Sequence, residues 1–225
     1  MFGAMRFHGT YLPHGVFVCF EGGDGSGKST QSRLLAERLE ALGHVVRPTF
    51  EPGDTPVGAE VRRIVLSPET GELSHRTEVL LYAADKSEHV DTVVIPALAR
   101  GEVVVTDRYV DSTLAYQGAG RDLDIREVEE VARWATGDIR PHLTVVLDVD
   151  PRDGLGRFEG RDRIEVEGLE FHGRARQLFL DLAAADPDHY LVLDGRGDRD
   201  ALAEQVMARL RPLLDQATAR TEVPR

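Results

Sequence analysis

Five short apolar segments rich in β-branched residues recur along the chain, with polar or helix-like stretches between them. They span Val16–Phe20, His44–Thr49, Val103–Asp107, Leu143–Val149 and Tyr190–Asp194. Within the third and fourth, Val103–Val105 and Val145–Leu147 are continuous apolar runs, which is the pattern of strands buried on both faces. The five segments therefore predict the strands of a parallel sheet.

The stretches between these segments carry helical periodicity. Leu34, Leu35, Leu39 and Leu42 fall on one stripe of an expected helix over Thr30–Leu42. The other expected helices span Thr77–Arg100, with a bend at Pro96, then Arg126–Ala135, Leu169–Ala185 and Asp200–Leu214. Alternating strands and helices predict an α/β fold, a five-stranded parallel sheet flanked by helices with right-handed crossovers.

The length of 225 residues suits one α/β domain, which we expect over residues 15–217. Residues 1–14 are expected to be a poorly ordered extension, and residues 218–225 a C-terminal tail. No run approaches the roughly 20 apolar residues of a membrane span, and the N-terminus lacks the pattern of a secretory signal, so a cytoplasmic protein is expected. The net charge of −12 disfavours a nucleic-acid partner.

A glycine-rich loop follows the first apolar run, where Gly22–Ser29 matches G-x-x-x-x-G-K-[ST]. Because the loop follows a buried strand and opens an amphipathic helix, it predicts a site for the phosphates of a nucleoside triphosphate. Lys28 can reach the β- and γ-phosphates, and the Ser29 hydroxyl can ligate Mg²⁺. The spacing is not that of a dinucleotide-binding loop. The residues expected to bind the nucleotide are Gly22, Gly23, Asp24, Gly25, Ser26, Gly27, Lys28, Ser29 and Thr30.

A carboxylate is needed near the metal, and two strand ends offer one, Asp107 and Asp148. We favour Asp107 because Arg108 follows it. An acid and a guanidinium at the carboxyl end of a strand lie beside the crevice where α/β sheets bind ligands. Asp148 remains the alternative.

Four further segments carry a resemblance to a known family. They read TFEPGDT at Thr49–Thr55, LLYAADK at Leu80–Lys86, TDRYVDSTLAYQG at Thr106–Gly118 and GRDRIE at Gly160–Glu165. Together with the phosphate loop they resemble thymidylate kinase, in the same order and at similar spacings. The resemblance implies the P-loop nucleoside monophosphate kinase fold with a short lid at about residues 152–165. It also implies a homodimer that phosphorylates dTMP to dTDP with ATP and Mg²⁺.

The resemblance further implies an acceptor site. Arg108 would clamp the acceptor phosphate, and Asp24 would lie near the sugar hydroxyl and the metal. Tyr82 occupies the place of an aromatic residue that stacks on thymine, and Tyr116 would pack where a 2′-hydroxyl would project. Lys86 occupies the place of an arginine that bonds the base carbonyl. The other expected acceptor-site residues are Glu51, Arg62, Ser112, Thr113 and Gln117.

Three positions depart from the family pattern. Phe50 stands where the family commonly has an arginine, and Arg62 is the nearest candidate to supply the missing contact. Lys86 replaces the expected arginine, so a forked contact becomes a point donor. Tyr82 replaces phenylalanine and adds a hydroxyl that needs a partner.

The catalytic arginine is expected from the lid. Some members of the family carry it within the phosphate loop, where this chain has Gly25, and others supply it from the lid. Of the lid arginines Arg157, Arg161 and Arg163, we favour Arg161. The expected catalytic set is Lys28, Arg108, Arg161, Asp24 and Asp107, and the expected metal ligands are Ser29, Asp24 and Asp107.

Two other functions remain open at this point. One is a P-loop kinase of another small acceptor, such as a deoxynucleoside, which Asp107-Arg108-Tyr109 and Tyr116-Gln117-Gly118 disfavour. The other is a non-enzymatic nucleotide switch, which the arginine-bearing lid and the absence of a base-reading N-K-x-D disfavour. Trp134 shares a helical stripe with Val128, Val131 and Ala135, and we expect it to pack in the core or in a dimer interface.

Overall fold

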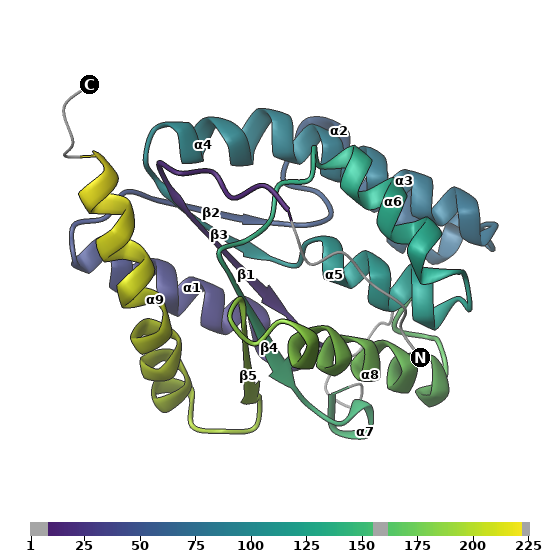
Figure 1. Cartoon of the computed structure of the whole chain (residues 1–225). Helices are drawn as coiled ribbons and strands as arrows, with labels where there is room; N and C mark the ends of the chain where they lie inside the picture. Colours follow the sequence, from purple (N-terminus) through teal and green to yellow (C-terminus); the bar gives the residue numbers. More distant parts are fainter. Residues whose placement is uncertain (1–8, 155–161, 222–225) are drawn as a thin grey trace.

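The computed structural model describes residues 9–154 and 162–221, and a single parallel sheet organises them (Figure 1). Its strands are β1 (Val16–Glu21), β2 (Val46–Phe50), β3 (Val103–Asp107), β4 (Leu143–Asp148) and β5 (Tyr190–Asp194). They pair in the order β2-β3-β1-β4-β5, all in parallel. The carboxyl ends of all five strands therefore meet at one edge of the sheet, where α/β folds bind ligands.

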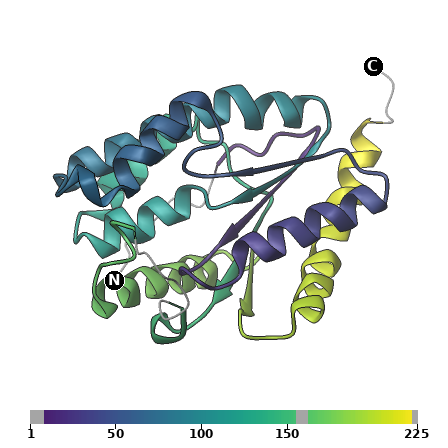
Figure 2. The ribbon, with the colours of Figure 1, turned by 180° about the vertical axis from the view of Figure 1, so that it is seen from behind.

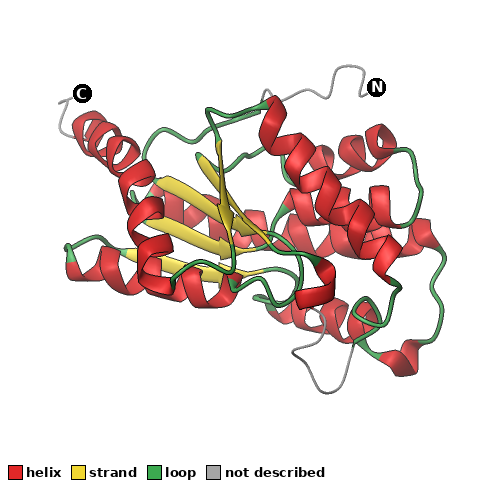
Figure 3. Ribbon diagram, turned by 90° about the horizontal axis from the view of Figure 1, so that it is seen from below, coloured by secondary structure: helices red, strands yellow, loops and turns green. Residues whose placement is uncertain are grey.

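Helices cover both faces of the sheet (Figure 3). In chain order they are α1 (Lys28–Ala41), α2 (Pro56–Leu66), the 3₁₀-helix η1 (Pro68–Thr70), α3 (His75–His89), the π-helix η2 (Val90–Val94), α4 (Ile95–Ala99), α5 (Val110–Thr113), the π-helix η3 (Leu114–Gly120), α6 (Ile125–Ala135), α7 (Pro151–Gly154), α8 (Leu169–Ala185) and α9 (Arg199–Thr221). Figure 2 shows α1 and α9 together on one face of the sheet.

The core consists of two layers, because successive side chains of β1 point to opposite faces. Val18 and Phe20 pack with residues of α1 and α9 in one cluster. Phe17 and Cys19 pack in a second cluster with residues of α3, α4, α6 and α8. Cys19 is buried, as expected of a small strand residue.

All five expected strands are present, with ends that differ by up to two residues, and the helix expected at Leu169–Ala185 has those bounds. The helix expected over Thr77–Arg100 is instead divided into α3, η2 and α4. The widened π-helical turn stands immediately before the Pro96 turn, where the proline ring crowds the preceding carbonyls. The expectation that Leu42 lies on a buried stripe is wrong, since it is 63% exposed beyond the end of α1.

The structure also changes two other expectations. Trp134 is 85% exposed, which excludes packing in the core of this chain, so packing in a dimer interface stays a prediction. Residues 9–14, expected to be poorly ordered, pack on the domain. Thr10 forms a parallel bridge with Ile139, and the ring of Tyr11 stacks on His189 with centroids 4.7 Å apart. Over the described ranges, we find no helix with the length and apolarity needed to cross a bilayer.

Candidate active site

A cleft of about 990 Å³ opens at the carboxyl ends of β2 and β3 beside the phosphate loop. All the acceptor-site residues expected from the sequence line this cleft. They are Glu51, Arg62, Tyr82, Lys86, Arg108, Ser112, Thr113, Tyr116 and Gln117. The loop residues that share the lining are Asp24, Gly25, Gly27, Lys28, Ser29 and Thr30, whereas Gly22, Gly23 and Ser26 are not part of it. Segments far apart in the sequence thus meet around one space large enough for two small ligands.

The phosphate loop joins β1 to α1 through backbone conformations that only glycine adopts easily. Gly22, Gly25 and Gly27 have φ values of 131°, 73° and 97°. Lys28, at the first turn of α1, donates a hydrogen bond from Nζ to the carbonyl oxygen of Gly23, at 2.7 Å. Burial, together with the nearby positive charge of Arg108, lowers the pKa of Lys28 to about 8. The backbone of the loop therefore helps to fix the position of the Lys28 ammonium.

The hydroxyl of Ser29 and the carboxylate of Asp107 are in direct contact in the lining of the cleft. Ser29 Oγ donates to Asp107 Oδ2 at 2.5 Å, while Asp107 Oδ1 is buried without a hydrogen-bond partner. A hydroxyl and a carboxylate with a free oxygen are hard donors of the kind that Mg²⁺ prefers beside substrate phosphates. Asp148, the alternative, is instead bound through both oxygens to Arg176, at 2.6 and 2.9 Å.

Arg108 lines the cleft from a turn directly after β3. Its φ of 71° places a non-glycine residue in the left-handed region, a conformation that must be held by its surroundings. Its guanidinium donates to the carboxylate of Asp24, to Ser112 Oγ at 3.0 Å and to the carbonyl of Gly22 at 3.3 Å. Although burial raises the pKa of Asp24, the charges of Arg108 and then Lys28 bring that pKa below its usual value.

Aromatic and hydroxyl side chains form another wall of the cleft. The Arg108 guanidinium carbon lies 5.2 Å from the centre of the Tyr116 ring. The hydroxyls of Tyr116 and Thr113 are buried without a hydrogen-bond partner in the described structure. Tyr82 of α3 is also buried, and burial raises the pKa of its phenol, so it remains neutral. Stacking surfaces and unpaired hydroxyls in one wall suit a nucleobase and its sugar.

Lys86 is engaged in a buried network. Its ammonium pairs with Glu51 Oε2, and His89 Nδ1 lies 2.7 Å from Glu51 Oε1. His89 Nε2 lies 2.6 Å from Thr49 Oγ1. Burial raises the pKa of Glu51, but the charge of Lys86 and the bond from His89 more than offset this and lower it. Lys86 reaches the cleft with its ammonium already paired, so its expected contact with a base carbonyl stays a prediction.

Arg62 lies beside Phe50, the position at which the family pattern commonly has an arginine. Its guanidinium carbon is 5.8 Å from the centre of the Phe50 ring, and its NH1 donates to the carbonyl of Pro52 at 2.8 Å. Arg62 therefore presents a positive charge in the cleft beside Phe50, and its role in supplying the contact of the missing arginine stays a prediction.

Sequence reasoning missed Glu78, a buried carboxylate of α3. It accepts hydrogen bonds from Gln117 Nε2 and Arg121 Nε, each at 3.1 Å, and pairs with Arg163. Arg163 Nε also donates to the carbonyl of Val65 at 3.1 Å. Arg163 is thus bound to the acceptor side of the molecule, whereas Arg157 and Arg161 lie outside the described residues.

Gly25 packs against the end of α7, at the start of the expected lid. A Cβ at Gly25 would lie 2.6 Å from the carbonyl oxygen of Gly154, and a Cβ at Gly154 would collide with the carbonyl oxygen of Asp24. An arginine side chain at position 25 would collide with backbone, which cannot move aside like a flexible side chain. This packing accords with an arginine supplied from elsewhere than the phosphate loop.

The strand order, the phosphate loop and the acceptor-side residues of the same cleft define a P-loop nucleoside monophosphate kinase fold. A family model described as thymidylate kinase matches residues 20–206. The chain is 56% identical to the thymidylate kinase of Cutibacterium acnes over 202 residues, covering 90% of this chain and 99% of that protein. It is 50% identical to that of Clavibacter sepedonicus, covering 89% and 96%.

A solved structure agrees with these relatives. The crystal structure of thymidylate kinase from Ehrlichia chaffeensis superposes with a TM-score of 0.72 at 31% identity, covering 88% of this chain and 99% of that one. The chain belongs to the thymidylate kinase family. It is a phosphotransferase that converts dTMP to dTDP with ATP as the phosphoryl donor.

Proposed function

We propose that the γ-phosphoryl group of Mg²⁺-bound ATP passes to dTMP within the cleft described above, and that Arg108 is the central contact to the acceptor phosphate. The observation that carries this proposal is the convergence in one cleft of the phosphate loop, the Asp107–Arg108 turn and the aromatic wall. Phosphoryl transfer needs little covalent chemistry from the protein, so positioning and charge neutralisation are what these residues supply.

On the donor side, backbone N–H groups of the loop and Lys28 hold the β- and γ-phosphates. Ser29 and Asp107 would hold Mg²⁺, with Asp24 close by. The ion neutralises charge on the phosphate oxygens when it is bound. The free oxygen of Asp107 supports this assignment, since a buried carboxylate oxygen without a partner is costly unless a ligand satisfies it.

On the acceptor side, Arg108 clamps the dTMP phosphate with its planar set of donors. Tyr82 stacks on the base, and Tyr116 occupies the space that a 2′-hydroxyl would need. Thr113 presents an unpaired hydroxyl to the nucleoside. Arg108 also forms a hydrogen bond to Asp24 of the phosphate loop, and this bond links the residue that clamps the acceptor phosphate to the loop that binds the donor phosphates.

The lid supplies the arginine that stabilises the transition state, and Arg161 is our assignment. One observation supports a lid origin, since Gly25 is too tightly packed on Gly154 for an arginine in the loop. Among the lid arginines, the pairing of Arg163 with Glu78 leaves Arg157 and Arg161 as the candidates, of which we favour Arg161. Arg161→Ala is expected to lower kcat strongly and leave the KM for dTMP nearly unchanged.

The test is steady-state phosphorylation of dTMP by ATP, compared with dUMP, UMP and thymidine. Arg108→Ala is expected to reduce kcat/KM for dTMP by about a hundredfold or more, because one charge-assisted contact to a phosphate is lost. Arg33→Ala is the matched control, since Arg33 is an exposed arginine of α1 paired with Glu37. Preference for thymidine over dTMP, or normal kinetics in Arg108→Ala, would contradict the proposal.

The enzyme also acts as a homodimer in this proposal, through the outer face of α2, α3 and α6. Three large apolar side chains stand exposed there, Val57, Leu80 and Trp134, on helices that pack against one another. Exposed apolar residues gathered on adjoining helices mark an interaction surface. The face is distinct from the cleft, and a second copy of the chain is the occupant that the family resemblance implies.

Sedimentation of Leu80→Glu and Trp134→Glu tests this face. Each substitution places an unpaired charge in the interface and is expected to yield a monomer. Leu42→Glu alters an equally exposed leucine on the opposite face of the sheet and should leave the dimer intact. A monomeric wild-type protein, or variants that remain dimeric, would refute the assignment.

A further inference from the structure

Glu21 is a buried carboxylate that none of the roles above employs. It is the last residue of β1, directly before the phosphate loop, and it is 0% exposed. A carboxylate is costly to bury unless several donors satisfy it. The question is therefore what its oxygens bind.

Both oxygens of Glu21 bind the short segment that follows Arg108. Oε1 accepts from the backbone N–H groups of Tyr109, at 2.8 Å, and of Ser112, at 3.1 Å. Oε2 accepts from the hydroxyl of Ser112 at 2.6 Å. Three bonds from one carboxylate thus fix the chain immediately beyond a residue whose backbone is in the left-handed region.

The Ser112 hydroxyl links Glu21 to the guanidinium of Arg108. A hydroxyl has one proton to donate and lone pairs that accept. Its proton points to Glu21, so its lone pairs are free for the Arg108 NH1 donor, 3.0 Å away. The bond from Arg108 NH1 to Ser112 Oγ depends on Glu21, because Oε2 of Glu21 accepts the Ser112 hydroxyl proton and so keeps that proton pointing away from Arg108.

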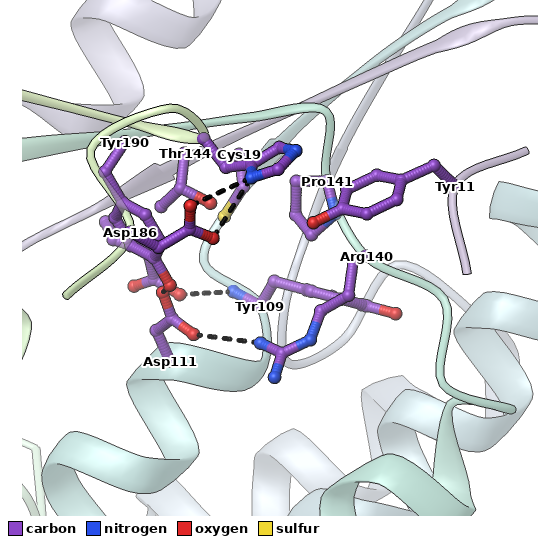
Figure 4. A pocket seen from close by; sticks show the side chains of 11 residues that line it. Tyr11, Cys19, Tyr109, Asp111, Arg140, Pro141, Thr144, Asp186 and Tyr190 are labelled. Carbon is purple, nitrogen blue, oxygen red and sulfur yellow. Dashed lines mark hydrogen bonds and ion pairs between the residues drawn. The ribbon is translucent and has the colours of Figure 1, made fainter. Parts of the chain in front are cut away.

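The other side of Glu21 borders a small cavity, which is also lined by Cys19, Asp111, Arg140 and Tyr190 (Figure 4). There Asp111 is already bound by the Tyr190 hydroxyl at 2.7 Å and lies 3.8 Å from Arg140. Burial and then the charge of Asp111 raise the pKa of Glu21 to about 7, so kinetics at about pH 8 observe mainly the ionised form.

We propose that Glu21 is a positioning residue for the acceptor phosphate, acting on Arg108 through the orientation of the Ser112 hydroxyl. This inference rests on the proposed role of Arg108 as the clamp. Glu21→Gln isolates the effect, because it keeps the shape and the Oε1 acceptor. The amide nitrogen of the glutamine replaces the acceptor Oε2 by a donor. The Ser112 hydroxyl must then accept from this donor, so its own proton points toward the Arg108 guanidinium.

The experiment is a double-mutant cycle of Glu21→Gln and Ser112→Ala, with kcat and KM measured for both substrates at about pH 8. Glu21→Gln is expected to lower kcat/KM for dTMP about ten- to a hundredfold, the loss typical of a charge-assisted contact. The KM for ATP should change less than about twofold. In the Ser112→Ala background the same substitution should change kcat/KM for dTMP less than about threefold, because the hydroxyl it acts through is gone.

Controls separate this role from simple support of the fold. Glu129→Gln alters another buried glutamate, on α6, and should leave kinetics unchanged even if its melting temperature falls. Equal effects of Glu21→Gln in both backgrounds would overturn the inference, since backbone support alone would act independently of Ser112. If Arg108→Ala lowers kcat/KM for dTMP strongly and Glu21→Gln does not change it, the inference about Glu21 is overturned while the role of Arg108 as the clamp stands. Normal kinetics in Arg108→Ala overturns the clamp and the inference together.

Discussion

The buried pair of Lys86 and Glu51 makes a quantitative prediction about stability. Lys86→Met removes the ammonium and keeps a side chain of similar length. The two side chains are 3% and 1% exposed, so the carboxylate left behind cannot turn to water. Glu51 keeps its hydrogen bond with His89 Nδ1, at 2.7 Å, but it loses the charge of Lys86. That charge is the largest of the effects that lower the pKa of Glu51 and so oppose the rise caused by burial.

The magnitude follows from breaking one side of a buried ion pair, which costs about 3–5 kcal/mol because a charge remains without its partner. The retained bond from His89 places the expected loss near the lower end, about 3 kcal/mol at pH 8. For a chain of this size that corresponds to a fall of about 6–12 °C in melting temperature. At lower pH the loss should shrink, because Glu51 can then take up a proton and become neutral.

Thermal unfolding followed by far-ultraviolet circular dichroism at several pH values gives the measurement. Lys86→Arg preserves the charge and should retain most of the stability, and Lys86→Met with Glu51→Gln should recover much of what the single variant lost. Arg33→Met is the control, an exposed cation whose removal should cost little. A melting temperature of Lys86→Met within about 2 °C of the wild type would refute the reasoning.

Three further predictions concern Asp85, which lies near Glu51, and three residues that line the cleft. Burial and then the charge of Glu51 raise the pKa of Asp85 to about 6. Between about pH 4 and 6 the native state holds a proton on Asp85 that the unfolded state has lost, so the wild type loses stability as pH rises through that range. Asp85→Asn does not titrate, so its free energy of unfolding, measured with a chemical denaturant, should rise by up to about 3 kcal/mol relative to that of the wild type over the same range. Ser29→Ala should raise the Mg²⁺ concentration that gives the half-maximal rate, and Asp107→Asn should raise it further. Tyr116→Phe should still reject the ribonucleotide counterpart of dTMP, whereas Tyr116→Ala should accept it more readily, as competition assays will report.

The strands were predictable because continuous apolar runs leave few alternatives, but α2, α5 and η3 of the acceptor side were not predicted. α2 buries only Gly58, Val61 and Val65, too few positions for a clear stripe. A local signal was nevertheless present. Thr55 caps the helix by accepting from the N–H of Gly58, and Pro56 occupies the first turn, where proline is favoured.

The motifs predicted which residues line the cleft but not which partners they bind. The pairing of Lys86 with Glu51 and the convergence on Glu78 join residues 35 or more positions apart. Such choices depend on tertiary packing, which no local pattern encodes. Glu21 was missed for a related reason, since a single acid at the end of a buried strand gives no indication of the donors that will surround it.

The contact between Gly25 and Gly154 has a consequence for how this family changes over evolutionary time. A side chain at Gly25 would collide with the backbone of Gly154, and a side chain at Gly154 would collide with the backbone of Asp24, so the two positions constrain one another. A single substitution at Gly25 would therefore remove stability unless the start of α7 moved away from the phosphate loop. The two segments are expected to accept larger residues only through coordinated change, so positions 25 and 154 should vary together among related sequences.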